Sequence, residues 1–338
     1  RFYGQLVHGG TTARWTSLDG AESVSVQWTE DPAVERRVPD LDFLTECDNR
    51  VWGCSSKENV IYASKLGDPT NWFSYRSIAA DSYAVTVGSD GPFTGAATCM
   101  GYALFFKENA LHKLYGSKPS DFQLSSMRCR GVARNAGQSV CVLNETLYYL
   151  SADGVMAWDG SIPTKVSTAL DAGKLANVTR AVGGALDGRY YLHLERADGA
   201  RLLVYDTERG LWQEEDVCSY EMASTGGQLY LWDTQALWAA DPSRERDWQD
   251  PAGTETSIPF ELTTGEMGLD AAENVYLSRM TLRLEAARRT RLQVAVSYDG
   301  GAWEVLTERV LDGEKRSLDL AFAPRRCGTL RLHLQGEG

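Results

Sequence analysis

The chain has 338 residues, of which 43% are hydrophobic and 24% are charged. These ordinary globular values exclude wholesale disorder and leave room for two domains. The formal net charge of −12 excludes a basic surface for gripping phosphates, so we expect no specific nucleic-acid binding. No apolar run approaches the roughly 18 residues needed to span a bilayer, so we expect no membrane anchor.

Two further features bound the chain. It begins at Arg1 within patterned sequence, so we expect a fragment whose natural N-terminus is missing. Its cysteines are odd in number and contain no Cys-x-x-Cys pair, which signals neither a disulfide framework nor a zinc site. We expect buried free thiols and folding in a reducing cytosol. The seven cysteines are Cys47, Cys54, Cys99, Cys129, Cys141, Cys218 and Cys327.

In chain order, residues 1–40 are expected to form N-terminal strands that contribute part of a blade. Beyond them, strand-like alternation broken by Gly, Asn and Asp turns dominates, and the one weak helical candidate is 168–176. Five hairpins recur, the second around a turn at Lys107, Glu108 and Asn109. They occupy residues 50–64, 102–114, 146–158, 189–205 and 228–239.

The hairpins repeat at steps of 52, 44, 43 and 39 residues. This interval is typical of β-propeller blades, which cannot bury both faces alone and must therefore stack on one another. WD and kelch signatures are absent, so the prediction depends on spacing and pattern. We predict an all-β fold with about five blades over 41–245, incomplete at the N-terminus.

A second domain follows. The stretch 241–253 is polar, contains Pro and Gly, lacks periodicity and therefore reads as a linker. Six alternating strands in 254–338 then predict a small antiparallel β-sandwich. We expect these strands at 258–263, 275–284, 291–298, 303–308, 316–322 and 329–335.

Several motifs, in the same order along one chain, resemble the tail stabilisation and tail nozzle proteins of tailed bacteriophages. They begin with Ser-Lys-Leu-Gly-Asp-Pro-Thr-Asn-Trp at 64–72 and continue through 114–124, 148–160, 264–270, 296–300 and 324–328. The resemblance implies a virion structural protein that folds in the bacterial cytoplasm and joins the tail. Its implied partners are copies of itself in a ring and other tail proteins. Members of this group carry a long N-terminal segment that this chain lacks.

The best-defined motif also has a local physical interpretation. Pro69 restricts φ, Asp68 and Asn71 can bond nearby backbone, and Gly67 can adopt a positive φ. Trp72 can then fold back onto a blade. We therefore interpret the motif as a stiff structural turn, with a partner contact as the alternative.

Candidate chemistry is sparse. His193 and His333 lie in alternating apolar strands, and no metal-ligand spacing is present, so we expect no metal and no cofactor. The acidic run 214–216 reads as a solvated loop between blades. The run 297–303 resembles the Asp-box of sialidases but is one residue short before Trp303, so we interpret its Asp-Gly-Gly as a hairpin turn. No catalytic residue is predicted.

Two alternatives to the structural role stay open. One is a glycan- or receptor-binding module, which an exposed aromatic platform on the sandwich would favour. The other is a glycoside hydrolase, which needs two carboxylates about 5 to 10 Å apart. The basic pairs of the acidic chain are solvated turn residues or contacts to an acidic neighbour. These candidate partner contacts are Arg288, Arg289, Arg325 and Arg326.

Overall fold

The computed structural model divides the chain into two compact units, Arg1–Asp241 and Pro242–Gly338. The division falls at the start of the predicted linker, which itself lies outside the described residues. The structure describes residues 2–6, 12–17, 23–27, 37–215, 221–240, 259–268, 275–286, 289–311 and 315–337.

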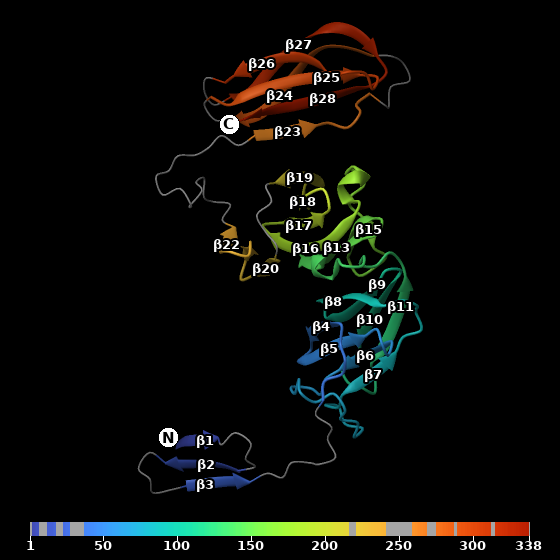
Figure 1. The fold of residues 1–338 in the computed structure, drawn as a ribbon, viewed down its shortest axis with the longest axis vertical. Coiled ribbons are helices and arrows are strands. Elements are labelled where there is room, and N and C mark those ends of the chain that lie inside the picture. The colour runs from blue at the N-terminus through green and yellow to red at the C-terminus, as the bar shows by residue number, and fades with distance from the viewer. Residues whose placement is uncertain are drawn as a thin grey trace. The chain divides into compact units, whose positions relative to one another are not determined.

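The first unit consists of consecutive antiparallel sheets, in which each strand pairs with the next along the chain (Figure 1). Among the described strands, the first and last of these sheets have three and the four between them have four. The three-stranded sheets are β1 (Phe2–Leu6), β2 (Thr12–Ser17), β3 (Ser23–Gln27) and β20 (Glu221–Thr225), β21 (Gln228–Trp232), β22 (Leu237–Ala240). The four-stranded sheets are β4 (Phe43–Cys47), β5 (Arg50–Ser55), β6 (Val60–Ala63), β7 (Tyr83–Thr86); β8 (Phe93–Cys99), β9 (Tyr102–Lys107), β10 (Ala110–Tyr115), β11 (Gln123–Arg128); β12 (Cys141–Leu143), β13 (Thr146–Ser151), β14 (Gly154–Trp158), β15 (Thr164–Lys165); and β16 (Val178–Leu186), β17 (Arg189–Arg196), β18 (Arg201–Asp206), β19 (Leu211–Glu215).

The five sheets from β4 to β22 confirm the predicted all-β fold of propeller-type blades. Each predicted hairpin is the second and third strand of one sheet. Within every sheet from β4 to β22, the first two strands join through two consecutive residues with positive φ. That backbone is typical of the two-residue turns whose twist matches a hairpin. The five turns are Asp48-Asn49, Met100-Gly101, Asn144-Glu145, Asp187-Gly188 and Gly226-Gly227, and they repeat at the same steps as the hairpins.

Neighbouring sheets share hydrophobic cores, because their central strands are buried on both faces. Phe105 of β9 joins a cluster with Trp52 and Ile61 of the preceding sheet. Phe106, the next residue, points to the opposite face and joins a second cluster with Tyr149 and later residues up to β18. The sheet β8–β11 is therefore sandwiched between its neighbours, as a blade should be.

Two sequence predictions in this unit are wrong in detail. The candidate helix 168–176 is a single 3-10 turn, η2 (Ala172–Leu175), which Asp171 caps by accepting a hydrogen bond from the Gly173 amide at 2.8 Å. Lys107 is not a turn residue: it ends β9 and is only 1% exposed. Its Nζ donates to Asn59 Oδ1 at 2.6 Å and to the Ser89 carbonyl at 2.7 Å. Burial lowers the pKa of Lys107.

The second unit is the predicted β-sandwich, built from one sheet in the order β23-β28-β25-β26 and a second of β24 and β27. Alternate residues of the larger sheet, including Val294, Val296 and Leu332, pack against Leu318 and Leu320 of the smaller one. All six strands were predicted, and β27 is longer than expected. Their bounds are β23 (Pro259–Thr263), β24 (Val275–Ala286), β25 (Arg291–Tyr298), β26 (Glu304–Val310), β27 (Lys315–Cys327) and β28 (Leu330–Glu337).

The six described cysteines are free thiols; Cys47, Cys54, Cys99 and Cys327 are buried, as predicted, whereas Cys129 and Cys141 are half-buried, and Cys218 lies outside the described residues. Burial raises the pKa of Cys54 to about 12 and that of Cys47 to about 11. Such thiols are protonated near neutral pH and act as small apolar side chains. Across the described part of the chain, no helix is long and apolar enough to cross a membrane.

Candidate functional site

One polar cluster among the blades joins Gln138, Arg180, Glu195 and Glu221 and is here called the Arg180 cluster. Arg180 lies in β16 and Glu195 opposite it in β17, while Gln138 comes from the 3-10 turn η1 (Gly137–Ser139) and Glu221 from β20. β16 and β17 belong to one sheet and β20 to the next, while η1 lies in the segment between β11 and β12. The cluster exists only because the sheets stack.

Arg180 bonds every other member of the cluster. Its Nη1 lies 3.0 Å from Glu195 Oε1, and its Nη2 donates to Gln138 Oε1 at 2.8 Å and to Glu221 Oε1. The Gln138 amide also donates to Glu221 Oε2 at 3.2 Å. Burial alone would lower the pKa of Arg180, but hydrogen bonds and the charges of Glu195 and Glu221 outweigh it and raise the pKa.

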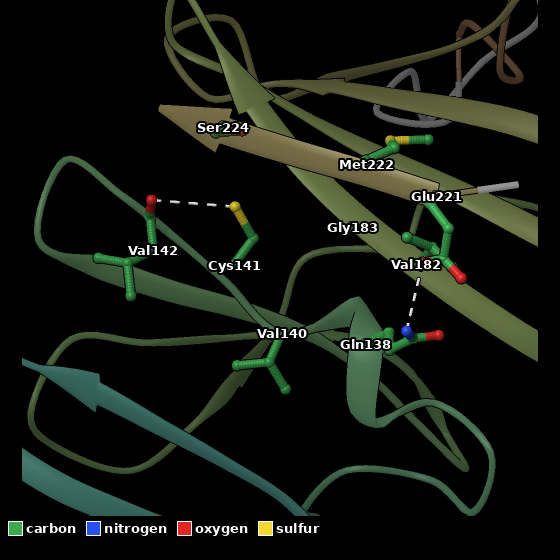
Figure 2. A pocket seen from close by; sticks show the side chains of 9 residues that line it. All are labelled: Gln138, Val140, Cys141, Val142, Val182, Gly183, Glu221, Met222 and Ser224. Carbon is green, nitrogen blue, oxygen red and sulfur yellow. Dashed lines mark hydrogen bonds between the residues drawn. The ribbon is translucent and has the colours of Figure 1, made fainter. Parts of the chain in front are cut away.

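Two hollows flank the cluster and share Gln138. The first, of about 450 Å³, lies between η1, β16 and β20, and Figure 2 shows Gln138 bonded to Glu221 on one side of it. On the other side the Cys141 thiol donates to the Val142 carbonyl. Burial raises the pKa of Cys141 to about 11, so this thiol is a poor nucleophile. The second hollow, of about 500 Å³, lies between the first residues of β4, β8 and β16.

The motif 67–72 is a tight turn in the loop between β6 and β7. Gly67 has a φ of +69°, and Asp68 Oδ1 accepts hydrogen bonds from the Thr70 amide and hydroxyl. Trp72 is buried, and its indole N–H donates to the Pro69 carbonyl at 2.8 Å. Asn71 is also buried, and its side-chain oxygen accepts from the Phe73 amide at 3.4 Å. These contacts are those expected of a stiff structural turn.

Sequence reasoning missed what anchors this loop. The buried guanidinium of Arg50 donates to the carbonyls of Ser64, Asp81 and Ala79 at 2.5 to 2.8 Å. The buried Asp81 carboxylate accepts from the Ser74 hydroxyl and from the amides of Arg76 and Ile78. Burial alone would raise the pKa of Asp81, but these hydrogen bonds outweigh it and lower the pKa. A charged residue in a strand and one in a loop carry no local sequence signal for this role.

The acidic run 214–216 is not the solvated loop that the sequence predicts. Glu214 and Glu215 end strand β19 instead of lying in a loop, and Asp216 lies outside the described residues. Glu214 binds Lys174 at 2.7 Å and Arg201 at 2.6 Å. Burial would raise the pKa of Glu214, but its two cationic partners lower it overall. Its carboxylate is therefore held as an ion-pair acceptor.

The histidines and the Asp-box-like run are also structural in character. His112 and His193 are buried strand residues, and His333 lies in β28, whereas His8 lies outside the described residues. Asp299 accepts hydrogen bonds from the amides of Gly328 and Thr329 at 2.8 and 2.9 Å and makes a hairpin turn with Gly300, as predicted. In the described ranges, no three His, Cys, Asp or Glu side chains converge as a metal site requires.

The described members of the basic pairs, Arg289, Arg325 and Arg326, have different surroundings. Arg325 binds Glu304 at 2.7 Å and lies over the Tyr298 ring, 5.0 Å from its centroid. Arg326 follows it in β27 and is exposed. Arg289 is exposed, has a φ of 72° and donates its amide to the Leu311 carbonyl. Arg288 lies outside the described residues.

No family model and no curated protein matches the chain. Among solved structures, an exo-beta-1,3-galactanase from Phanerochaete chrysosporium is 10% identical, with a TM-score of 0.32, covering 87% of this chain and 91% of that one. The N-terminal domain of Nup159 is 12% identical at a TM-score of 0.34, covering 87% and 89%. Hsv2 of Kluyveromyces lactis is 10% identical at 0.35, covering 89% and 93%. Such distant likenesses transfer no activity to this chain.

Proposed function

We propose that the chain is a non-catalytic structural component of a phage or prophage tail, which helps to form or brace the tail conduit by self-assembly. The observation that carries the proposal is that the buried and clustered charged side chains form hydrogen bonds and ion pairs that connect different structural elements. Arg180 links two successive sheets and the η1 turn, Arg50 holds the 64–81 loop, and Lys107 bonds neutral acceptors from outside its own sheet. Mutually bonded charges of this kind rigidify a fold.

The same cluster argues against hydrolysis. A glycosidase needs one carboxyl group that can present a proton to its substrate and a second that acts as nucleophile or base. Glu221 is the one carboxylate among the described residues that line the two hollows, and the Arg180 guanidinium engages both Glu221 and its neighbour in the cluster, Glu195. Their oxygens serve as acceptors within the protein.

The acidic balance of the chain supports a conduit role. With a net charge of −12, the protein repels nucleic acid on average, so DNA passing nearby would not adhere to it. The ordered motifs at 64–72, 114–124 and 148–160, which resemble those of tail proteins, add the link to phage.

Immunogold electron microscopy on particles released from the induced host tests this role. Antibodies raised against this chain should label one end of the tail, and the purified particles should contain the protein in a fixed multiple. Detection of the protein only outside particles would refute the tail role. Turnover of a galactan or model glycoside that is lost in Glu221→Gln would refute the non-catalytic role.

A further inference from the structure

The outer face of the larger sandwich sheet carries an exposed tryptophan seated on polar neighbours. Trp303, just before β26, is 44% exposed. Its ring lies 5.3 Å from the His333 ring, and the Arg331 guanidinium lies 5.8 Å from the Trp303 centroid. Arg331 and His333 are alternate residues of β28, whose intervening residue Leu332 lies in the core, so both point to the outer face.

This tryptophan is held in place. Ala295 faces outward, since its neighbours Val294 and Val296 are in the core, yet it is only 3% exposed. It pairs with His333 across the sheet, so side chains on the outer face must cover it. An aromatic ring supported in this way loses little conformational freedom when a ligand stacks on it.

The groups around the ring are hydrogen-bonding side chains. Gln335 donates to Gln293 at 2.5 Å, and His333 Nδ1 lies 3.0 Å from Thr263 Oγ1 and 3.7 Å from Glu261. These side chains come from the adjacent strands β23, β28 and β25, and their register places them on one face. Amide, imidazole, hydroxyl and carboxylate groups together offer donors and acceptors within reach of one ring.

We propose that this face, the Trp303 platform, binds a saccharide. The platform comprises Trp303, Arg331, His333, Gln293, Gln335 and Glu261.

The apolar area of the platform decides between a saccharide and a protein partner. Near Ala295 the exposed apolar side chains of the described residues are Trp303 and Val305. The apolar area of these two side chains is small beside the roughly 800 Å² per partner of a standard protein interface. The area does match one pyranose ring, whose C–H face stacks on an aromatic π-face while its hydroxyl groups reach the surrounding polar groups. The inference concerns the sandwich alone and does not depend on the tail role proposed above.

The test uses the full 338-residue chain on an array of immobilised bacterial surface polysaccharides, followed by saturation-transfer NMR with the methyl glycosides of the sugars in each hit. We expect binding to at least one polysaccharide. Trp303→Ala should weaken it about tenfold or more, as loss of a central aromatic contact does. Trp303→Phe, which keeps a ring, should retain part of the affinity.

Trp232→Ala is the matched control, because Trp232 of β21 is 43% exposed but belongs to the blades. It should leave binding unchanged. Should Trp303→Ala perturb the fold by circular dichroism, Gln335→Leu on the same face should still lower affinity. Absence of binding to every polysaccharide, or equal binding by wild type and a folded Trp303→Ala, would overturn the proposal.

Discussion

The blades and the sandwich bury their strands in different ways. In β9 of the blades, consecutive residues Ala103 to Lys107 are all buried, because a sheet packs against each face. In β28 of the sandwich, Leu330 and Leu332 are buried while Arg331 and His333 remain partly exposed. Continuous burial leaves a strand no surface for ligands, whereas alternation leaves one complete face. The blades are thus suited to rigidity and the sandwich to contact.

The largest expected effect is on core packing. Phe105→Ala and Phe106→Ala, on opposite faces of β9, should each lower the free energy of unfolding by about 3–5 kcal/mol. In strand β25 of the sandwich, only the inward-facing one of two neighbouring residues should contribute strongly to stability. Val294→Ala should cost about 1–3 kcal/mol and Gln293→Ala about 0.5 kcal/mol or less. Urea unfolding measures all four; a mild effect of either phenylalanine variant would mean that one face of β9 is open.

The second-largest expected effect is the pH dependence of folding stability that the buried His112 causes. This ring is fully buried, bonds Ser89 and Ser126 at 2.8 Å, and has its pKa lowered to about 4 by burial and by the charge of Lys107. The unfolded chain takes up a proton near pH 6.5 while the folded chain resists, so stability falls as the pH drops toward 4. We expect a loss of about 2 kcal/mol between pH 7 and pH 5.

His112→Gln is the variant that isolates this effect. Urea unfolding at pH 7, 6 and 5 should show the loss in the wild type and a flatter profile in His112→Gln. An unchanged slope in His112→Gln would mean that other groups cause the pH dependence.

The third-largest expected effect is the loss of stability when Arg180 no longer links neighbouring sheets. Arg180→Met keeps the aliphatic stem but removes the bonds to Gln138, Glu195 and Glu221, and should cost about 1–2 kcal/mol. Arg209→Met, which removes an exposed pair with Asp206, should change stability by about 0.5 kcal/mol or less. Thermal unfolding measures both, and equal effects would show that the Arg180 cluster does not brace the blades.

The smallest effect is at the 67–72 turn. Gly67 has a φ of +69° and open space where a Cβ would lie, so Gly67→Ala should cost about 1 kcal/mol through backbone strain alone. Gly88→Ala is the matched control, since Gly88 also faces open space and its φ is not positive. Equal unfolding midpoints for the two variants would contradict a strained turn.

The sequence predicted the central strands of each sheet well, because apolar runs such as 102–106 are long and regularly spaced. It missed outer strands such as β15 (Thr164–Lys165), which are short and polar and whose pairing depends on the neighbouring strand. It also missed the Arg180 cluster, since Gln138 and Glu221 are 83 residues apart and meet only after stacking. Trp303 ends the Asp-box-like run 297–303, but its place on an outer face depends on sheet register, which that run does not predict.

Native-state hydrogen exchange of the full chain tests the stacked-blade account most directly. We expect the amides of β9, β13 and β17 to exchange slowest and to open together as one cooperative unit, since they are covered on both faces. Those of β25 and β28 should open separately. Independent opening of each blade hairpin, with protection no greater than in the sandwich, would contradict the account.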